Sequence, residues 1–373
     1  MPTAAAYLRG WFSEPAPTFE LRQPSARWGA PQSREARRTL RVAQLIQETP
    51  STRTFVLESA DDRPALAYRA GQHLTLLVEI GGTTHRRCYS FSSSPVSGEP
   101  TAITVKRSAT GLVSQYLHDH VRVGDTLVVT EPAGQFVLPT EPALARTIVM
   151  VAGGVGITPL ASLAETLLLE EPRTRVVLLT GNRMESEIIF RERIARLAAR
   201  FAPRLDVRHA VDLAPTGWDG IVGMLDGARV LAALGRTDAD AYFVCGPETM
   251  MDSVCATLAA AGVDRDRIHT ERFAYAAARP ARIPEHAAHI TFAASGKRVT
   301  ARPGQTVLQA GLEAGVDLPY SCTMGGCGAC KVHKSSGSVV ASEPNCLTDS
   351  EREAGYVLAC CSYADSDLTI DNQ

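Results

Sequence analysis

The 373-residue sequence lacks the features of membrane-spanning, secreted and nucleic-acid-binding chains. No apolar run approaches the roughly 18 residues of a transmembrane helix, and residues 1–9 lack the basic start and apolar stretch of a signal peptide. An excess of one charge is also missing, because 38 Lys and Arg are balanced by 40 Asp and Glu. The net charge of −2 gives no electrostatic reason to expect nucleic acid or an anionic membrane as partner. We therefore expect a cytoplasmic protein with no nucleic-acid partner and no integral membrane segment.

The cysteine content argues against a disulfide framework. There are nine cysteines, an odd number, and they are spread over a long chain. Internal repeats and low-complexity tracts are absent as well. With 45% apolar and 21% charged residues the composition is that of a globular protein, not of a disordered or fibrous one. The length predicts two or three domains, each with its own core.

Changes in sequence pattern divide the chain into five parts. Residues 1–39 are rich in Arg and Pro without a sustained period, which indicates an N-terminal arm, either a docking segment or a tolerated extension. Short β-like runs in 40–143 are typical of an antiparallel barrel, and strands alternating with helices in 144–275 indicate a parallel sheet that binds a nucleotide. Residues 276–288 have the composition of a linker, and 289–373 form a small β-rich unit.

The expected elements follow these divisions. Strands are expected at 41–46, 54–57, 73–80, 87–91, 103–107 and 126–130 in the barrel, at 147–151, 175–180 and 241–245 in the parallel sheet, and at 290–292, 297–300, 332–333, 338–340 and 368–370 in the last unit. Helices are expected at 112–118, 158–170, 188–201 and 249–261.

A cysteine cluster is the most informative motif. Cys322, Cys327 and Cys330 form a C-x4-C-x2-C pattern, and Cys360 follows after a gap of 29 residues. This is the plant-type spacing of a [2Fe–2S] cluster, in which four thiolates converge on two irons. The glycines among residues 325–328 let the loop wrap closely and point backbone N–H groups at the sulfurs. A structural zinc site is the alternative, but such sites usually pair their ligands as two C-x2–4-C hooks.

The fourth ligand has two candidates, Cys360 and Cys361. The segment around them resembles the closing strand of plant-type ferredoxins, in which the ligand follows Leu-Ala. The resemblance implies that Cys360 is the ligand, and that Cys361 and Cys346 are packed thiols.

Four motifs in the barrel point to a flavin. They are Arg87-Cys-Tyr-Ser90, the strand 103–107 with Val105 and Lys106, Gly111-Leu-Val113-Ser114, and the Glu-Pro-Ala-Gly-Gln-Phe of residues 131–136. Their order resembles that of the ferredoxin–NADP reductase family. The resemblance implies that Arg87 neutralises a flavin phosphate, that Tyr89 stacks on the isoalloxazine and that Ser90 hydrogen-bonds near its N5. The further cofactor contacts that it implies are Val105, Lys106, Gly111, Val113 and Ser114.

The chemistry of these residue types suits that assignment. A guanidinium binds a phosphate in a bidentate manner, and a flat aromatic ring stacks on a flat cofactor. A glycine before a helix N-terminus is suited to cradle a pyrophosphate, which favours FAD over FMN. An ordinary solvated strand and a capped helix are the alternative reading.

Two glycine-containing turns lie in the part of the chain that is expected to bind a nucleotide, residues 144–275. The first is Gly153-Gly154-Val-Gly156-Ile-Thr158-Pro159, and the second is Cys245-Gly246-Pro247-Glu-Thr-Met250; each joins a strand end to a helix start. Such turns bring backbone N–H groups and the helix dipole to a pyrophosphate. The first is not G-x-G-x-x-G, but it is similar to the reductase family's G-G-x-G-I-T-P.

The resemblance implies roles for two further residues. In the family the second turn borders the nicotinamide, with its Cys near the carbon that loses the hydride; the corresponding residue is Cys245. An isolated buried thiol is the alternative. Glu271-Arg-Phe273 is similar to the segment that returns toward the flavin, which gives Phe273 a flavin-facing role, although an aromatic at a strand end is usually core.

The choice between NADPH and NADH depends on charge near the adenosine ribose. Arg183 follows the second strand of the parallel sheet, where it can meet a 2′-phosphate, and Arg191 is a second candidate. This favours NADPH, while a solvated arginine at a helix start explains either residue equally well.

Together the sequence predicts a multi-domain protein with an antiparallel β-barrel flavin domain, an α/β parallel-sheet NAD(P)-binding domain and an α+β β-grasp ferredoxin domain. This combination resembles the reductase components of multicomponent oxygenases, such as the phenylacetyl-CoA oxygenase and ketosteroid hydroxylase reductases. The resemblance implies hydride transfer from NAD(P)H to FAD, with Ser90 and Cys245 at the reacting atoms, and then single electrons through the cluster to a terminal oxygenase or hydroxylase. The alternatives are a desaturase or cytochrome P450 as partner, or a redox-sensing binding protein, which needs no hydride entry.

Overall fold

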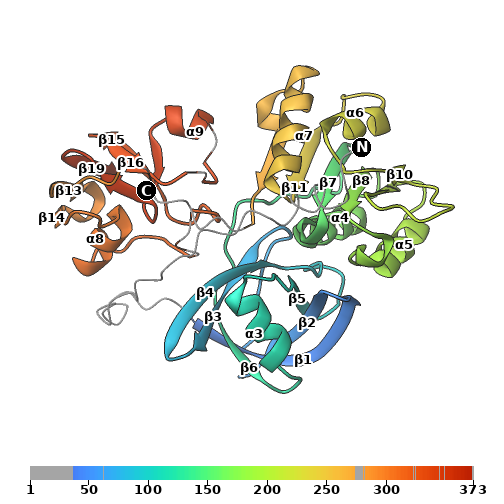
Figure 1. Cartoon of the computed structure of the whole chain (residues 1–373), viewed down its shortest axis with the longest axis horizontal. Helices are drawn as coiled ribbons and strands as arrows, with labels where there is room; N and C mark the ends of the chain where they lie inside the picture. The colour runs from blue at the N-terminus through green and yellow to red at the C-terminus, as the bar shows by residue number, and fades with distance from the viewer. Residues whose placement is uncertain are drawn as a thin grey trace, which may run out of the picture.

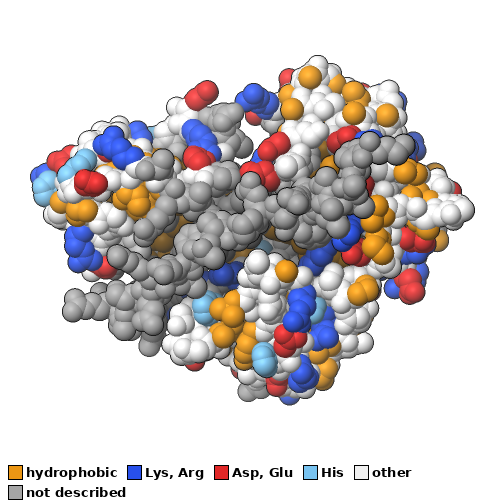
Figure 2. All heavy atoms as spheres, in the orientation of Figure 1, with side chains coloured by type: hydrophobic (Ala, Val, Ile, Leu, Met, Phe, Trp, Pro, Cys, Tyr) orange, Lys and Arg blue, Asp and Glu red, His pale blue; other side chains and the backbone are white. Residues whose placement is uncertain are grey.

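The computed structural model describes residues 37–371 except 62, 274–279, 281, 322, 324, 344 and 348. Residues 1–36 of the arm expected at 1–39, residues 276–279 and 281 of the linker expected at 276–288, and Cys322 lie outside the described residues. The described chain forms three modules grouped around a common centre (Figure 1). Lys and Arg side chains are interspersed with Asp and Glu on the face shown in Figure 2, as the small net charge suggests. None of the described helices is long and apolar enough to cross a membrane.

The first module is the expected antiparallel sheet. Its strand order is β4-β3-β6-β1-β2-β5, and alternate side chains such as Leu40, Val42, Phe55 and Leu57 fill the core. The elements are β1 (Arg37–Thr49), β2 (Thr52–Ser59), β3 (His73–Ile80), β4 (Thr83–Ser90), β5 (Thr101–Lys106), helix α3 (Leu112–His120) and β6 (Thr126–Thr130).

Two boundaries in this module differ from expectation. Strand β1 begins at Arg37, because Arg37 pairs with Thr130 of β6, so residues 37–39 belong to the sheet and not to the arm. The strand expected at 87–91 is the second half of β4, which begins at Thr83 after a tight turn. That turn is Gly81-Gly82 with φ of 60° and 75°, a conformation that favours glycine and joins β3 to β4 as a hairpin.

The second module is a parallel sheet of order β10-β9-β8-β7-β11-β12. Its strands are β7 (Thr147–Gly153), β8 (Arg175–Asn182), β9 (Leu205–Val211), β10 (Ile221–Val222), β11 (Ala241–Cys245) and β12 (Ile268–Glu271). Its helices are α4 (Ile157–Glu170), α5 (Arg191–Arg200), α6 (Gly227–Leu234) and α7 (Glu248–Ala260). From β7 the chain adds β8, β9 and β10 on one side of that strand. It then crosses to the other side and adds β11 and β12, so the direction of strand addition reverses between β7 and β11. In open sheets of this kind ligands bind at the carboxyl ends of the strands at such a point.

The helix expected at 188–201 begins three residues late. Phe190 has a φ of 61°, which ends the preceding turn in the left-handed region and prevents a continuous helix. Ile188, Ile189 and Phe190 are buried in the core instead. Their apolar character therefore reflects packing of a loop and not a helical face.

The third module is a five-stranded mixed sheet, β14-β13-β19-β15-β17, with a two-stranded pair of β16 and β18. Its elements are β13 (Ala288–Phe292), β14 (Lys297–Ala301), α8 (Val307–Glu313), β15 (Lys331–Ser336), β16 (Val339–Ala341), α9 (Asp349–Glu353), β17 (Tyr356–Leu358), β18 (Ser362–Ala364) and β19 (Leu368–Asp371). Ala288, expected at the end of the linker, is already in β13, where it pairs with Ala301. Helix α8 was not expected, although the Thr306 and Gln309 capping box marks its start.

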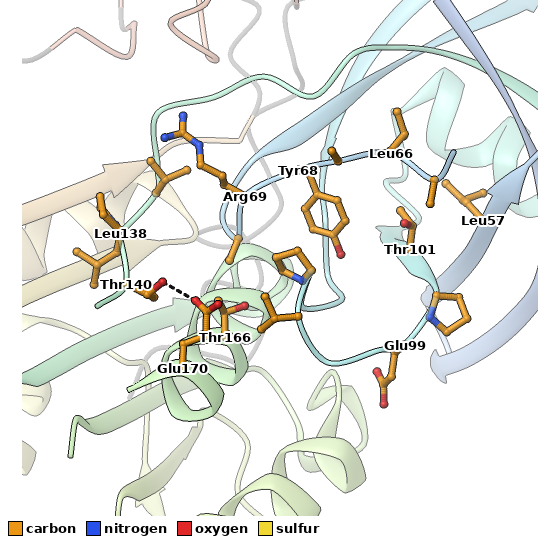
Figure 3. A pocket seen from close by; sticks show the side chains of 18 of the residues that line it. Leu57, Leu66, Tyr68, Arg69, Glu99, Thr101, Leu138, Thr140, Thr166 and Glu170 are labelled. Carbon is orange, nitrogen blue, oxygen red and sulfur yellow. Dashed lines mark hydrogen bonds between the residues drawn. The ribbon is translucent and has the colours of Figure 1, made fainter. Parts of the chain in front are cut away.

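The barrel and the parallel-sheet module are joined by buried polar contacts. The Ser93 carbonyl accepts a hydrogen bond from Ser162 on α4 at 2.7 Å, and Ser94 shares one with Thr166 at 2.7 Å. Beside this seam lies a cavity of about 770 Å³. Figure 3 shows its wall, to which the barrel contributes Tyr68 and the connector contributes Leu138, and the hydrogen bond from Thr140 to Glu170. None of the expected site residues lines this cavity.

Candidate functional site

The two glycine turns of the parallel sheet pack directly on each other. A Cβ atom on Gly156 would lie 2.2 Å from the Cys245 carbonyl oxygen, and one on Gly153 would lie 2.4 Å from the Pro247 ring. Gly246 is equally enclosed, since its Cβ would lie 2.7 Å from the Gly153 nitrogen. Glycine is therefore required where β7 and β11 end, and the structure brings both expected motifs to the crevice between these strands.

Helix α4 starts at this crevice. Thr158 and Pro159 are buried in its first turn, and the Thr158 hydroxyl donates to the Val155 carbonyl at 3.0 Å. The turn has neither an acidic residue nor a side-chain cap, so its backbone N–H groups and the positive end of the dipole face the crevice. These are the properties of an anion cradle, as a pyrophosphate requires.

The expected reacting residues meet at the boundary of barrel and sheet. Ser90, at the end of β4, donates a hydrogen bond from its hydroxyl to Glu271 Oε2 at 3.2 Å. Cys245 is fully buried and lies beside Glu271, because the two are partners in the β11–β12 ladder. The second carboxylate oxygen of Glu271 lies 3.9 Å from Nδ1 of His73, the first residue of β3. Ser90 and Cys245 are thus linked through Glu271.

Glu271 and His73 are site residues that no sequence motif indicated. Glu271 stands in the Glu271-Arg-Phe273 segment, where the resemblance gave a role to Phe273 alone. The available signal was its position: a carboxylate at the carboxyl end of a strand next to Cys245, where parallel strands collect functional groups. No local signal pointed to His73, because its neighbour Glu271 is remote in sequence.

Burial controls the protonation of this cluster. The Glu271 side chain is only 11% exposed, and its burial raises its pKa to about 7, with His73 and the Ser90 hydrogen bond acting in the opposite direction. Burial, together with the Glu271 charge, raises the pKa of Cys245, so Cys245 is a neutral thiol. The site therefore holds an uncharged sulfur beside a carboxyl group that can take up or release a proton near neutrality.

The flavin-strand residues have the expected alternation. Arg87 and Tyr89 lie two residues apart on β4 and so point to one face, while Ser90 points to the other. Burial raises the pKa of Tyr89, whose ring packs against the barrel core. Arg87 makes a 2.7 Å hydrogen bond to the Arg86 carbonyl. This face therefore presents the Arg87 guanidinium, which suits a flavin phosphate, and the Tyr89 ring, which suits stacking on the flavin ring system.

Helix α3 lies against strand β5, since the ring of His118 hydrogen-bonds the Val105 carbonyl at 2.9 Å. Gly111 caps it without a side-chain hydrogen bond, and Val113 and Ser114 are buried in the first turn. The Ser114 hydroxyl donates to the Gly111 carbonyl at 2.9 Å and accepts from the Ser108 N–H at 3.1 Å, which fixes the turn. The strand before it ends with Val105, which is buried, and Lys106, whose ammonium lies 3.9 Å from Glu187 of the parallel-sheet module.

The remaining residues expected to contact NAD(P)H or the flavin lie in different surroundings. Arg191 forms an ion pair with Glu185, whereas the Arg183 side chain makes no hydrogen bond or ion pair among the described residues. Met250 lies close to Gly153 and Gly246. Phe273 packs against the core of the parallel-sheet module, so its described contacts are those of a core aromatic.

Three of the four expected cysteine ligands are described. Cys330 and Cys360 are buried in one core cluster, and the Ala359 N–H donates to the Cys330 carbonyl at 3.0 Å, which ties the two segments together. Cys327 is half-buried in the loop, where Gly325 and Gly328 have φ of 79° and 71°. Cys361 packs in the same core as Cys360. Thiols on a tight glycine-rich loop and on the nearby turn between β17 and β18 suit an iron–sulfur cluster.

The cysteine loop lies against the barrel. The ligand-type atoms of His73, Cys88 and Cys327 are all within 4.8 Å of one another. Cys88 directly precedes Tyr89 on β4, and His73 begins β3. The cysteine loop, strand β4 and the Ser90–Glu271 pair are therefore neighbours, and all three modules contribute to one site.

Comparison with protein-family models identifies all three modules. Residues 39–138 match the oxidoreductase FAD-binding domain, 150–256 the oxidoreductase NAD-binding domain, and 290–365 the 2Fe-2S iron-sulfur cluster binding domain. These matches confirm the three expected modules and the choice of FAD.

Curated relatives match over nearly their whole length. The chain is 33% identical to the glycine betaine monooxygenase reductase subunit of Pseudomonas aeruginosa, covering 90% of this chain and 95% of the relative. It is 34% identical to the ferredoxin reductase component of 3-ketosteroid-9-alpha-monooxygenase from Rhodococcus rhodochrous, covering 86% and 92%. Among solved structures, phthalate dioxygenase reductase superposes with a TM-score of 0.56 at 25% identity, covering 90% of this chain and 97% of that one.

Proposed function

We propose how this chain works from the premise that it belongs to the family of ferredoxin–NADP reductase-type flavoproteins with a C-terminal [2Fe–2S] domain, the reductase components of multicomponent oxygenases. It is an NAD(P)H-dependent flavin and iron–sulfur oxidoreductase. When bound, FAD accepts a hydride from NAD(P)H and the cluster carries single electrons onward. The single observation that supports our residue-level proposal is the convergence of Ser90, Glu271, Cys245 and the cysteine loop on one site.

The chain's own residues position the reactants. We assign Arg87 and the start of α3 to the FAD phosphates, and Tyr89 to the flavin ring. The crevice between β7 and β11, with its N–H groups at the start of α4, is assigned to the NAD(P)H pyrophosphate. Cys245, an uncharged buried thiol, shapes the nicotinamide side of the site without placing a charge there.

Glu271 and Ser90 form a hydrogen-bonded pair that can hold and transfer a proton. Because the Glu271 pKa is raised to about 7, the carboxyl can hold a proton at its oxygen and share it with the Ser90 hydroxyl 3.2 Å away. His73, 3.9 Å from the other oxygen, lowers the cost of the ionised form. The pair can therefore accept or return the proton that accompanies reduction at the flavin-facing end of β4.

The four cluster ligands in this proposal are Cys322, Cys327, Cys330 and Cys360. The buried position of Cys330 beside the Cys360 segment supports two of them. Module boundaries of 37–143, 144–275 and 288–373, an N-terminal arm and a linker complete the proposed organisation. We place the protein in the cytoplasm, and we propose a terminal oxygenase or hydroxylase as its electron acceptor.

A preference for NADPH is proposed from Arg183. Its side chain is half-buried at the end of β8 and makes no polar contact with any other described residue, whereas Arg191 is held by Glu185. A guanidinium in this state is available to a 2′-phosphate. We expect Arg183→Ala to raise the KM for NADPH and leave that for NADH unchanged, with Arg191→Ala as the matched control. An equal KM change for both nucleotides would refute the preference.

The function itself is tested on the purified holoprotein. Anaerobic addition of NAD(P)H should bleach the flavin and then the cluster absorbance, and cytochrome c as an artificial one-electron acceptor should be reduced. A protein that binds the cluster but takes no electrons from either nucleotide would support the sensing alternative. Reconstitution with an oxygenase, a desaturase or a cytochrome P450 would then identify the class of acceptor.

A further inference from the structure

One arginine of the barrel holds the cysteine loop in place. The Arg86 Nε donates a hydrogen bond to the Ser321 carbonyl at 3.0 Å, and its guanidinium lies 5.3 Å from the centre of the Tyr320 ring. The Ser321 hydroxyl also shares a hydrogen bond with that of Thr75 on β3. These contacts connect residues more than 230 positions apart, so they report the docking of one module on another and not local structure.

The contact between Ser321 of the cysteine loop and Thr75 of the barrel is buried. Ser321 is only 3% exposed although it lies in a loop. Its partner Thr75, on β3, is fully buried. A second, exposed contact joins Lys331 of the third module to Gln135 of the barrel at 3.2 Å. The face of the loop that carries Ser321 is thus closed off from any other protein in this arrangement.

This contact has a consequence for electron entry. Arg86 and Thr75 belong to the strands that also carry Tyr89 and His73, and the docked loop places Cys327 within 4.8 Å of Cys88. The strand that we assign to the flavin ring is therefore the strand on which the cysteine loop rests. Separation of the loop from β4 would lengthen the path that an electron crosses.

We propose that Arg86 is a positioning residue that sets two opposing rates, electron loading of the cluster and electron delivery to a partner. While Arg86 holds Ser321 and Tyr320, the loop is in place to be loaded but its docked face is covered. When the contact opens, the same face becomes available to an acceptor protein. This inference rests on the proposed function and adds a control point to it.

The size of the effect follows from the contacts. A charge-assisted hydrogen bond and a cation–π contact are lost together when Arg86 is replaced by Gln, and the loss of one such bond shifts an equilibrium about tenfold. The balance in each electron step is unchanged by the substitution: NAD(P)H supplies the hydride, FAD accepts it, and the cluster takes one electron at a time and passes it to the acceptor. Only the fraction of docked molecules changes.

The experiment compares wild-type holoprotein with Arg86→Gln and Arg86→Lys. Stopped-flow absorbance separates flavin reduction by NAD(P)H from cluster reduction, and a second mixing experiment follows the reoxidation of a dithionite-reduced cluster by cytochrome c. We expect Arg86→Gln to leave flavin reduction unchanged, to slow cluster loading by up to about tenfold and to speed delivery to cytochrome c. Arg86→Lys, which keeps the charge but loses the Nε donor, should be intermediate.

A structural readout accompanies the rates. Amide hydrogen exchange of residues 318–321 should increase in Arg86→Gln, while the electron paramagnetic resonance spectrum of the reduced cluster stays unchanged. The matched control is Arg41→Gln, since Arg41 lies on the same barrel in an exposed ion pair with Glu58, on a strand that pairs with neither β3 nor β4.

Four outcomes are decisive. Unchanged loading, delivery and exchange in Arg86→Gln would overturn the proposal, and so would loading and delivery that slow together, because docking must affect them with opposite signs. Lost FAD in Arg86→Gln would also overturn it by giving Arg86 a role in cofactor binding. A wild-type protein in which NAD(P)H reduces neither flavin nor cluster would instead contradict the proposed function.

Discussion

Replacing Glu271 by Gln should stabilise the protein at alkaline pH. The Glu271 carboxyl is nearly buried, and its pKa is raised from an ordinary 4.5 to about 7. Between pH 4.5 and 7 the unfolded chain has released this proton while the folded chain still holds it. Because the unfolded state then binds fewer protons, the free energy of unfolding falls as pH rises through this window, and it stays low above it.

The magnitude follows from the two pKa values. A difference of about 2.5 between them, multiplied by 1.36 kcal/mol per pKa unit, corresponds to about 3 kcal/mol. A glutamine side chain at this position cannot ionise, so the variant should escape this loss. We expect Glu271→Gln to exceed the wild type by as much as about 3 kcal/mol at pH 8, and to match it near pH 4.5, apart from a small change in the Ser90 hydrogen bond.

Urea unfolding at a series of pH values, followed by the signal of the parallel-sheet module, measures this difference. Glu171 provides a matched control of opposite sign in the same module. Its side chain is fully buried, and although burial raises its pKa, hydrogen bonds from Arg146, Thr174 and the Glu141 backbone outweigh that effect and lower it. Its contribution to stability is therefore present at neutral pH and lost in acid, so Glu171→Gln should destabilise at pH 8 by about 3 kcal/mol.

The result that refutes this reasoning is specific. If wild type and Glu271→Gln show parallel stability profiles from pH 4.5 to 8, while Glu171→Gln behaves as expected, the Glu271 pKa is not raised in the folded protein. Its proposed part in proton handling would then lose its physical basis.

Three further predictions concern the cofactors and the partner. Cys360→Ser should lose the cluster, seen as loss of iron and of visible absorbance, while Cys361→Ser should keep it; the reverse pattern would exchange the fourth ligand. Arg87→Ala should weaken FAD binding by about 2 to 5 kcal/mol, because a phosphate charge loses its partner, and an unchanged flavin content after extensive dialysis would contradict this assignment. Residues 286–373 carry nine Asp or Glu against six Lys or Arg, a net of −3, so electron delivery to a partner with a basic surface should slow as ionic strength rises. Turnover that stays flat with added salt, at constant cytochrome c activity, would instead indicate apolar docking.

The sequence predicted the modules better than their boundaries. The strands His73–Ile80, Thr126–Thr130 and Ala241–Cys245 agree to the residue, because each is an apolar run bounded by turn residues. Strand β9 was missed since its sequence, LDVRHAV, mixes charge with apolar residues, and pairing between two strands stabilises it instead. Phe190 shows the opposite error: this apolar loop residue was included in the helix predicted at 188–201, although the helix begins at Arg191.

The site was predicted where its residues are close in sequence. Motifs such as Gly153–Pro159 and Arg87–Ser90 carry their chemistry locally, and the structure brings the two glycine turns together as expected. Glu271 could not be found in this way, because its contacts with Ser90 and His73 form only when β12 meets the barrel. His73 pairs with Ser90 in the β3–β4 hairpin, but its place in the site depends on Glu271. Their function arises from juxtaposition between modules, which no local pattern records.

The strand order of the third module also fixes when its cluster can be loaded during biosynthesis. Strand β19 lies between β13 and β15, and Ile290 pairs with Leu368, so the centre of the sheet is completed by a segment made long after its first strand. The ribosome therefore releases the cysteine loop before the sheet that supports it can close, and such non-local pairing is slow. The fourth proposed ligand, Cys360, is made only eight residues before Leu368, so the complete set of ligands and the closed sheet become available almost together.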